Sequence, residues 1–392
     1  MTKLKIIING KILIKNEIVY GKVLLFDEKI LEFVEAENLE KLLPKCEEII
    51  DARGNFVSPG FIDMHVHGSG GYDVMDGTSD ALSVISSVLA ENGVTGFLPT
   101  TMTMSEEKIY AALDNIRLHM KNKINGAKIL GAHMEGPFIN KKYKGAQKED
   151  FIIKPNFRFV EDYIDVIKLI TLAPEEDDNF DFIKETVKKT NIILSIGHSN
   201  AEYEETMEAI KCGISHATHT FNAMTPLNHR KPGIVGAIFN SDIYCELIAD
   251  GIHVHPAIFN ILKKVKGTNR IILITDSMRA GCLRDGVSEL GGQKVIVKNN
   301  SARLEDGTLA GSILKLNEGV KNFMDNSNID ICEAISLVSI NPARELGLDK
   351  TKGSLEVGKY ADIVILDSNF NVQQTIVEGN TVFKLNEMKR CL

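Results

Sequence analysis

Short apolar runs alternate with polar turns at both ends of the chain. Runs of this kind are typical of β-strands, and they occupy residues 5–9, 11–14, 18–26 and 30–35 near the start and 362–366, 372–377 and 381–384 near the end. A small antiparallel sheet built from one set alone cannot bury both of its faces. We therefore predict that residues 1–57 and 354–392 meet in one small β-sandwich domain, with the middle of the chain inserted between them.

Residues 58–353 follow a different pattern, in which an apolar strand, a loop and an amphipathic helix repeat. Eight runs fit buried strands, at 61–65, 94–99, 128–133, 168–173, 192–197, 214–219, 246–250 and 270–275. Helical patterns occur at 79–92, 106–122, 180–189, 201–212, 256–266, 312–326 and 331–340. Eight such strands predict an α/β fold, a (β/α)8 TIM-type barrel. The segment 282–306 interrupts the repeat with a hairpin pattern and is predicted to be an insertion.

The composition is that of a globular protein without a nucleic-acid or membrane surface. Of the 392 residues, 44% are hydrophobic and 25% are charged. The net charge of -8 does not favour binding to nucleic acids or anionic membranes, and no apolar run approaches membrane-spanning length. Six scattered cysteines favour free thiols in a reducing cytoplasm. The lysine-containing start predicts a strand and turn, not an export signal.

Side chains that commonly bind metals stand where the predicted strands end. Side chains at i and i+2 share one side of a strand, so a His-x-His pair can bind one ion. Taken alone, such a pair is equally compatible with a polar loop. In a barrel the C-terminal ends of the strands meet at one rim. Five of the predicted strands carry candidates there, namely His65, His67, Glu135, His198, His219 and Asp276.

This donor set indicates a catalytic metal centre. Nitrogen and oxygen donors without thiolate favour Zn or Fe, with Co or Mn possible, over a structural cysteine-rich zinc site. An ion with an open position lowers the pKa of water toward 7 and so activates it at neutral pH. Glu135 is predicted to be a ligand, although a tight turn also needs such an acceptor. Asp276 is predicted to be the general base and acid, with a loop or helix cap as the alternative.

The other histidines have simpler explanations. His133, two residues before Glu135, is predicted to pack behind the ligands or to be a reserve ligand. We expect His216 to be structural, His119 to be solvated on the polar side of a helix, and His255 to lie at the surface. His253 follows the seventh predicted strand, where a position on the rim and a capped loop are equally compatible with the sequence.

A basic stretch at residues 221–233 follows His219 directly. Arg230 offers a planar donor fork for phosphate, and the backbone N–H groups of Asn222 and Ala223 can add to an anion nest. The alternative is an exposed basic loop. In a chain that is acidic overall, this stretch is the candidate binding site for an anionic substrate.

Six motifs follow one another in the chain: PGFIDMHVH at 59–67, HMEGPF at 133–138, GHS at 197–199, ATHTFNAM at 217–224, ADGIH at 249–253 and TDS at 275–277. In this order they resemble the amidohydrolase superfamily and, within it, the N-acetylglucosamine-6-phosphate deacetylases. The resemblance covers nearly the whole chain. The EGPF and FNAM motifs separate this family from dihydroorotases and hydantoinases, which usually use a carboxylated lysine as a bridge.

The resemblance implies roles for individual residues. It implies Glu135, His198 and His219 as the metal triad and Asp276 as the catalytic acid and base. Both histidines of the first strand are present, so one or two divalent ions are expected. Some members carry histidine where Gln147 stands. The implied substrate contacts are Ala146, Gln147, Asn222, Ala223, Arg230, His253, Leu309, Ala310 and Gly311.

The resemblance also implies a reaction and an assembly. The expected reaction is hydrolysis of N-acetyl-D-glucosamine 6-phosphate to D-glucosamine 6-phosphate and acetate, in amino-sugar catabolism or cell-wall sugar recycling. Members are typically homodimers, whose Arg and His substrate contacts can come from the neighbouring subunit. The alternative is another metal amidohydrolase that acts on an N-acyl amino acid or a cyclic amide. A scaffold without catalytic activity is disfavoured, because none of the expected ligands is missing.

Overall fold

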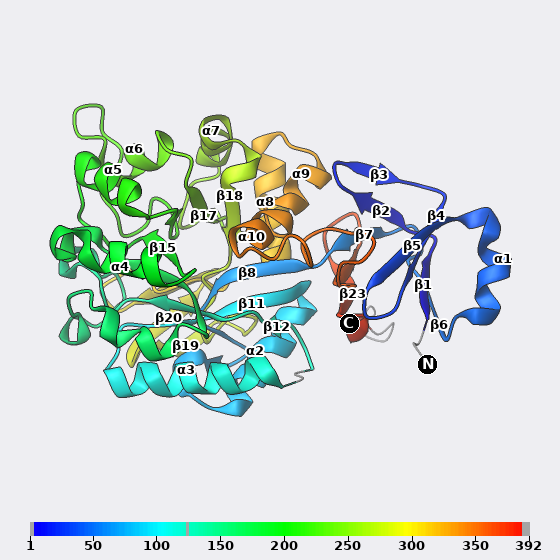
Figure 1. Cartoon of the computed structure of the whole chain (residues 1–392), viewed down its shortest axis with the longest axis horizontal. Helices are drawn as coiled ribbons and strands as arrows, with labels where there is room; N and C mark the ends of the chain where they lie inside the picture. Colours follow the sequence, from blue (N-terminus) through cyan, green and yellow to red (C-terminus); the bar gives the residue numbers. More distant parts are fainter. Residues whose placement is uncertain (1–3, 123–124, 386–392) are drawn as a thin grey trace.

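The computed structural model describes residues 4–122 and 125–385 (Figure 1). A helix-covered barrel occupies one side of the molecule, and strands from both ends of the chain form a sheet-rich domain on the other side. Within the described residues, no helix is both long enough and apolar enough to cross a membrane. The five described cysteines are free, and Cys391 lies outside the described residues.

The barrel consists of parallel strands that run in chain order around it. The third predicted strand is split in two, because β12 and β13 both pair with β11. The predicted TIM-type barrel is thus confirmed. Its strands are β8 (Phe61–Val66), β11 (Val94–Thr101), β12 (Lys128–Ile129), β13 (Ala132–Glu135), β14 (Ile167–Leu172), β15 (Ile193–Ile196), β16 (His216–Ala217), β17 (Tyr244–Ile248) and β18 (Ile271–Ile274).

The first and last strands close the barrel just where two of the candidate motifs lie. The backbone N–H of Asp276 donates to the carbonyl of His65 at 2.9 Å, and that of His67 donates to the carbonyl of Ser277 at 2.8 Å. Below this seam, the buried carboxylate of Asp63 accepts a hydrogen bond of 2.7 Å from the hydroxyl of Thr275. The closure therefore brings His-x-His and Asp276 together.

Helices cover the barrel strands, and their bounds agree with the predicted helices to within a few residues at most positions. The described helices are α1 (Leu39–Leu42), α2 (Ser79–Glu91), α3 (Glu106–Lys121), α4 (Asp181–Lys189), α5 (Tyr203–Cys212), α6 (Gly233–Phe239), α7 (Ala257–Lys266), α8 (Leu316–Ser327), α9 (Ile331–Ser336) and α10 (Ile340–Glu345). The helix predicted at 331–340 ends at Ser336 as α9, and a break separates it from α10, which was not predicted apart from its first residue, Ile340. This division puts Pro342 in the first turn of α10, where it does not interrupt a helix interior.

His119 differs from its prediction. It is buried, with 8% of its surface exposed, and its Nδ1 lies 2.8 Å from the carbonyl of Asn115. Three residues before it stands Ile116, which is fully buried on the same face of α3. The expectation of a solvated side chain was therefore wrong.

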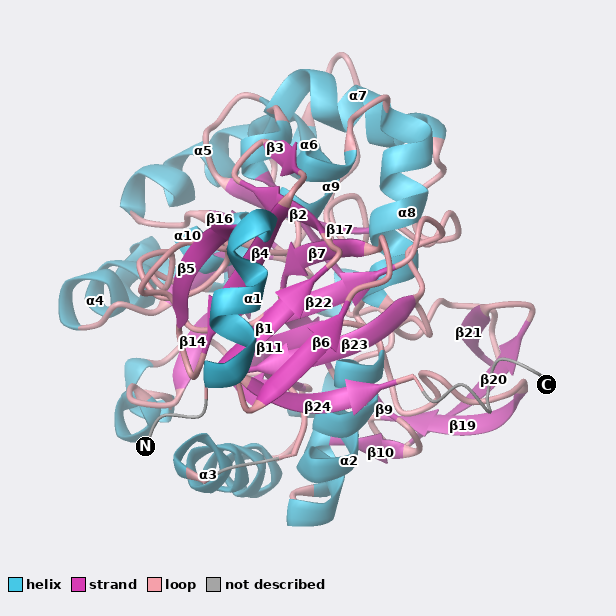
Figure 2. Ribbon diagram, turned by 90° about the vertical axis from the view of Figure 1, so that its right-hand side faces the viewer, coloured by secondary structure: helices cyan, strands magenta, loops and turns pink. Residues whose placement is uncertain are grey.

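The two ends of the chain meet in two sheets, as predicted (Figure 2). One sheet has the order β5-β4-β1-β6 and the other β24-β23-β22-β7-β2-β3. Their bounds are β1 (Lys5–Ile8), β2 (Lys11–Ile14), β3 (Glu17–Val19), β4 (Lys22–Phe26), β5 (Ile30–Glu35), β6 (Glu48–Asp51), β7 (Phe56–Pro59), β22 (Ile363–Leu366), β23 (Val372–Val377) and β24 (Asn380–Lys384).

The sheets of this terminal domain differ from the prediction in two respects. They are mixed and not antiparallel throughout, because β1 pairs with β6, and β2 with β7, in parallel. The strand predicted at 18–26 is two strands, β3 and β4, separated by a turn at Gly21 with φ of 71°. Apolar side chains from both ends, including Phe26 and Ile363, share one core between the sheets. The boundaries at residues 57 and 354 remain our proposal.

The chain passes between the terminal domain and the barrel twice, and at the first of these connections a single glycine separates the two. Strand β7 ends at Pro59 and β8 begins at Phe61, so only Gly60 separates them. A Cβ atom at Gly60 would lie 2.1 Å from the hydroxyl oxygen of Thr95. The close approach of β11 therefore requires glycine at this position.

The predicted insertion is a three-stranded antiparallel sheet, which is one strand more than a hairpin. Its strands are β19 (Gly286–Leu290), β20 (Gln293–Lys298) and β21 (Ser301–Leu304). The side-chain amide of Gln293 donates to the carbonyl of Ala146 at 2.5 Å. The insertion is therefore joined to the loop that follows β13.

A buried ion pair between the end of the barrel segment and the terminal domain gives a test of this packing. Lys352 Nζ lies 2.7 Å from Asp362 Oδ2 and 3.3 Å from Glu378 Oε1, with the Lys352 and Asp362 side chains 8% and 5% exposed. Lys352→Met leaves the Asp362 carboxylate buried without its cation. We expect a loss of about 3–5 kcal/mol in the free energy of unfolding, measured by urea denaturation.

The exposed pair of Lys211 and Glu208 serves as the control, with 67% and 54% of the side chains exposed. Lys211→Met should change the free energy of unfolding by less than about 1 kcal/mol. Equal losses for both variants would contradict the importance of the Lys352 pair.

Candidate active site

Four histidines and one glutamate converge where the barrel strands end. Glu135 Oε1 lies 3.2 Å from Nε2 of His198 and 3.1 Å from Nε2 of His219, whereas Oε2 lies 3.2 Å from Nε2 of His67. Nε2 of His65 is 3.4 Å from Glu135 Oε1 and 3.3 Å from Nε2 of His67. All five side chains are buried. They form two overlapping groups that share Glu135, so one carboxylate can bridge two ions.

The hydrogen bonds of the other ring nitrogens determine where the imidazole lone pairs point. Nδ1 of His67 lies 3.2 Å from the carbonyl of Thr100, and Nδ1 of His198 lies 2.9 Å from the carbonyl of Tyr143. A carbonyl only accepts hydrogen bonds, so each Nδ1 carries a proton, and Nε2 is the nitrogen that can bind an ion. Both Nε2 atoms face the oxygens of Glu135. A proton or a metal ion between each nitrogen and the carboxylate stabilises this arrangement.

The spacing fits a metal ion. Ligand atoms at ~2.1 Å from a tetrahedral ion lie roughly 3.4 Å from one another. The Nε2 atoms of His198 and His219 are 3.1 Å apart, and the distances to Glu135 fall in the same range. The donor set is nitrogen and oxygen without sulfur. The residues therefore fit a divalent metal centre of the catalytic type.

The charges of the cluster favour binding of cations. Burial raises the pKa of Glu135, but His65 and His198 outweigh burial and hold this pKa well below its usual range. Burial likewise raises the pKa of Asp276, and His65 and His67 outweigh it, so the pKa is lowered. Burial lowers the pKa of His67, but Asp276 and Glu135 raise it to about 9. Both carboxylates are thus ionised at neutral pH.

Asp276 lies beside the two histidines of the first strand. Its Oδ1 is 3.5 Å from Nε2 of His65 and 3.4 Å from Nε2 of His67. The backbones of Asp276, His198 and His219 have φ of 50°, 49° and 27°, in the left-handed region that these residues rarely adopt. Such conformations cost on the order of 1–3 kcal/mol each and persist where the surrounding structure requires them. They point these three side chains toward the cluster.

The cluster opens into a cavity of about 320 Å³. Twelve of the predicted site residues line it: His67, Glu135, Ala146, Gln147, His198, His219, Asn222, Ala223, His253, Asp276, Leu309 and Gly311. Nδ1 of His253 lies 2.6 Å from Asp250 Oδ2. Fully buried His65 lies in the metal cluster behind this lining, and Ala310 is buried beneath it.

Arg230 does not line the cavity. It lies on the exposed loop 226–231, where its Nη1 is 2.7 Å from Nε2 of His229. The predicted contact between Arg230 and a phosphate therefore stays a prediction.

Several lining residues were not predicted from the sequence. They are Met102, Lys142, Tyr143, Gly145, Leu290 and Thr308. Leu290 ends β19, so the insertion forms part of the cavity wall. The available signal was positional, because loops after the C-terminal ends of barrel strands surround the site in this fold.

Gln147 holds Glu135 in place. Its side-chain N–H donates to Glu135 Oε2 at 2.6 Å, and its Oε1 accepts from the backbone N–H of Thr103 at 2.8 Å. The second bond fixes which end of the amide faces Glu135. Gln147 thus contacts a metal-binding carboxylate as well as the cavity.

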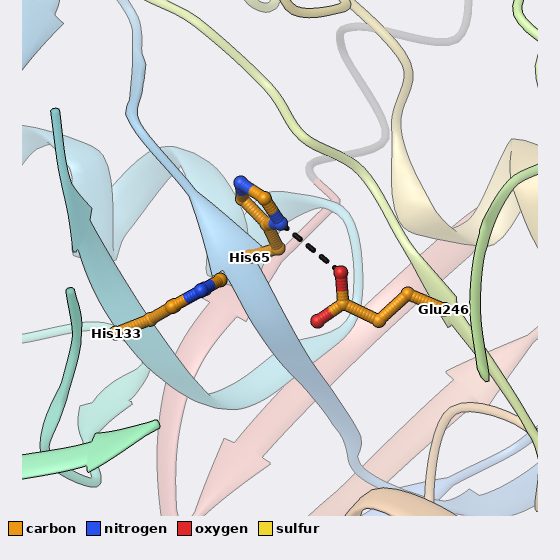
Figure 3. A group of neighbouring side chains, drawn as sticks. All are labelled: His65, His133 and Glu246. Atoms are coloured by element: carbon orange, nitrogen blue, oxygen red, sulfur yellow. Dashed lines mark hydrogen bonds and ion pairs between the residues drawn. The ribbon is translucent and has the colours of Figure 1, made fainter. Parts of the chain in front are cut away.

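His133 packs against the cluster without being free to bind an ion. Its ring lies 4.5 Å from that of His65 (Figure 3). Nδ1 lies 3.2 Å from the carbonyl of Met64, and Nε2 lies 2.7 Å from the hydroxyl of Thr171. Burial, followed by the nearby charge of His65, lowers its pKa to about 3. His133 is therefore neutral, donates from Nδ1 and accepts at Nε2, as expected of a packed histidine.

Comparisons with known proteins agree with this geometry. The chain matches the family model described as "Amidohydrolase family" over residues 56–382. It is 43% identical over 348 residues to N-acetylglucosamine-6-phosphate deacetylase of Bacillus subtilis (strain 168), which covers 87% of this chain and 88% of that protein. It is 36% identical over 336 residues to N-acetylgalactosamine-6-phosphate deacetylase of Escherichia coli O157:H7, and the aligned region covers 84% of this chain and 89% of that protein.

A solved structure extends the similarity to the whole fold. The crystal structure of N-acetylglucosamine-6-phosphate deacetylase from Pasteurella multocida superimposes with a TM-score of 0.91 at 34% identity. The superposition covers 98% of this chain and 100% of that chain. The terminal domain and the barrel therefore both belong to the shared architecture.

The sharing of Glu135 predicts how metal is lost on mutation. Glu135→Ala removes a donor from both groups, so we expect both ions to be lost. His198→Ala should remove only the ion of its own group. Metal per subunit, measured by elemental analysis after dialysis, checks both expectations. His255→Ala, at an exposed position, is the control. A Glu135→Ala protein that retains its metal would show that Glu135 is not a ligand.

Proposed function

The chain belongs to the amidohydrolase family and, within it, to the N-acetylglucosamine-6-phosphate deacetylases, and we propose that it hydrolyses N-acetyl-D-glucosamine 6-phosphate to D-glucosamine 6-phosphate and acetate. The observation that carries the proposal is the convergence of Glu135, His198, His219 and Asp276 on one cavity, in a chain with these relatives. Acetate release from the sugar phosphate by the purified, metal-loaded protein tests it. Absence of release would exclude it.

The metal ligands in this proposal are Glu135, His198 and His219 for one ion and His65, His67 and Glu135 for a second. Zn or Fe is the proposed metal, because imidazole and carboxylate donors suit both. A divalent ion held here supplies a Lewis acid that polarises the acetyl oxygen and lowers the pKa of water. Elemental analysis of the purified protein identifies the metal and its stoichiometry.

Asp276 is the proposed proton carrier. It lines the cavity and its pKa is lowered, so it is an ionised acceptor at neutral pH. It takes the proton of the attacking water as the carbon–oxygen bond forms. It then donates that proton to the sugar nitrogen as the carbon–nitrogen bond breaks, which leaves acetic acid and the amine, and at neutral pH the acid's proton passes to the amine to give acetate and an ammonium group. Proton uptake and release thus balance over the reaction.

The proposed substrate contacts lie around the rest of the cavity. Backbone groups of Asn222 and Ala223 and the side chain of His253 are proposed for the sugar phosphate. Ala146, Gln147, Leu309, Ala310 and Gly311 complete the proposed set. The protein is proposed to form a cytoplasmic homodimer. In it, the exposed Arg230 is proposed to contact the phosphate of the substrate that is bound to the neighbouring subunit, since Arg230 lies outside the cavity of its own chain.

The similarity to an N-acetylgalactosamine-6-phosphate deacetylase favours a second candidate substrate. The two sugars differ only in the configuration of one hydroxyl, so a comparison of kcat/KM on both epimers decides between them. The alternative of an N-acyl amino acid or a cyclic amide is not favoured, because both curated relatives described above are sugar-phosphate deacetylases.

The proton-carrier role predicts the effect of Asp276→Asn. An amide cannot accept the proton, so kcat for acetate release should fall by about 10²–10⁴-fold. Metal content and the unfolding temperature of the variant are measured in parallel. A folded variant that retains both metal and most of the activity would remove Asp276 from this role.

The phosphate-binding role predicts selective losses for Arg230→Ala. A charge-assisted hydrogen bond contributes ~1.5–3 kcal/mol, so kcat/KM for the phosphorylated substrate should fall by roughly 10- to 100-fold. Activity on unphosphorylated N-acetyl-D-glucosamine should not change. Lys231→Ala, at an exposed neighbouring position, is the matched control. Equal losses on both substrates would contradict a contact with the phosphate.

Mixing two variants tests whether Arg230 acts across subunits. In a heterodimer of Asp276→Asn and Arg230→Ala, one site would combine an intact Asp276 with an intact Arg230 from the other subunit. Random exchange should then restore roughly a quarter of the wild-type sites. No recovery after subunit exchange would mean that both residues act in the same subunit.

A further inference from the structure

A buried chain of charged groups lies behind the histidine of the first strand. Glu246, on β17, has an Oε2 atom 3.1 Å from Nδ1 of His65 (Figure 3). Its Oε1 lies 3.3 Å from Nε2 of His216, and Nδ1 of His216 lies 3.2 Å from Glu345 Oε1 on α10. The chain Glu345, His216, Glu246 and His65 therefore leads from a helix outside the barrel to the metal cluster.

Glu246 is held in place by groups that compensate its burial. Its side chain is fully buried, and a carboxylate in such a position needs a cation or several hydrogen bonds. The backbone N–H of His219 donates to Oε2 at 3.0 Å. His216 supplies the cation: burial lowers its pKa, but Glu246 and Glu345 outweigh burial and raise it to about 9. The contact of 3.3 Å between Nε2 of His216 and Oε1 of Glu246 is an ion pair without hydrogen-bond geometry.

Among the four histidines of the cluster, His65 differs in what its Nδ1 contacts. The corresponding partners of His67 and His198 are the backbone carbonyls of Thr100 and Tyr143. Nδ1 of His219 has no hydrogen-bond partner in the described structure. A carboxylate acceptor fixes the ring and increases the basicity of Nε2 more than a neutral carbonyl does. Only His65 has this support.

We propose that Glu246, held by His216 and Glu345, is a positioning residue that determines occupancy of the ion bound by His65, His67 and Glu135. The ion bound by Glu135, His198 and His219 is linked to Glu246 only through the backbone N–H of His219. An amide oxygen can also accept this N–H, so Glu246→Gln affects this ion less than the ion that His65 binds. The proposal rests on the metal centre of the proposed function. It does not depend on which amide is hydrolysed.

Co²⁺ titration of the metal-free protein tests the proposal independently of activity. In a His198→Ala background, which retains the group of His65, Glu246→Gln should weaken Co²⁺ binding by about 10- to 100-fold. In a His67→Ala background, which retains the group of His198, the same substitution should leave the affinity unchanged within about twofold. Calorimetry and the visible absorption of Co²⁺ both report the binding.

The controls separate positioning from folding. Asp177 is another carboxylate of low exposure, which accepts backbone N–H groups at the start of α4 and lies outside the cavity. Asp177→Asn should therefore leave the Co²⁺ affinity unchanged in both backgrounds. Should Glu246→Gln fail to fold by thermal unfolding, Glu345→Gln replaces it. In the His198→Ala background, Glu345→Gln should also weaken Co²⁺ binding, but by a smaller factor than Glu246→Gln.

Two results would overturn the proposal. One is unchanged Co²⁺ affinity in the His198→Ala background for both Glu246→Gln and Glu345→Gln. The other is equal weakening in the two backgrounds. In either case, a wild-type protein that binds two Co²⁺ and releases acetate would leave the proposed function intact. A wild-type protein that binds no Co²⁺ would overturn the metal centre itself.

Discussion

The site depends on the direction in which imidazole lone pairs point. Carbonyls of Thr100 and Tyr143 and the carboxylate of Glu246 accept hydrogen bonds from Nδ1 of three histidines, so their Nε2 atoms face Glu135. Nitrogen and oxygen atoms at 3.2–3.4 Å need a proton or a metal ion between them, and the metal ion replaces the protons when it binds. The barrel makes this arrangement possible, because strands far apart in the sequence end at the same rim.

The barrel and most of the ligands could be predicted because each depends on a local pattern. Parallel strands covered on both faces are continuous apolar runs, and their ends are recognisable from the sequence. Helix α6 was missed because Gly233–Phe239 is a short apolar segment with two glycines and has no polar face to give a helical period. His119 was misjudged because the residue type was given more weight than the helical spacing, which puts His119 on the same face of α3 as the buried Ile116.

The rest of the site depends on tertiary contacts. Lys142 lies in the segment after β13 and Leu290 at the end of the inserted strand β19, and packing determines the positions of both. Arg230 lies on an exposed loop and does not line the cavity of its own chain. Glu246 could have been noticed, since it is a carboxylate directly before the apolar residues 247–249 of the strand predicted at 246–250. A charged residue in a buried strand requires a partner, but the identity of the partner, His216, emerges only from the fold.

The link at Gly60 has a consequence for how the protein can change over time. Strand β7 belongs to the six-stranded terminal sheet and β8 carries His65, with one glycine between them. The terminal domain is therefore not a module that recombination can exchange cleanly between enzymes. A graft from another protein would shift the strand that carries His-x-His, so the two domains are expected to be inherited as one unit.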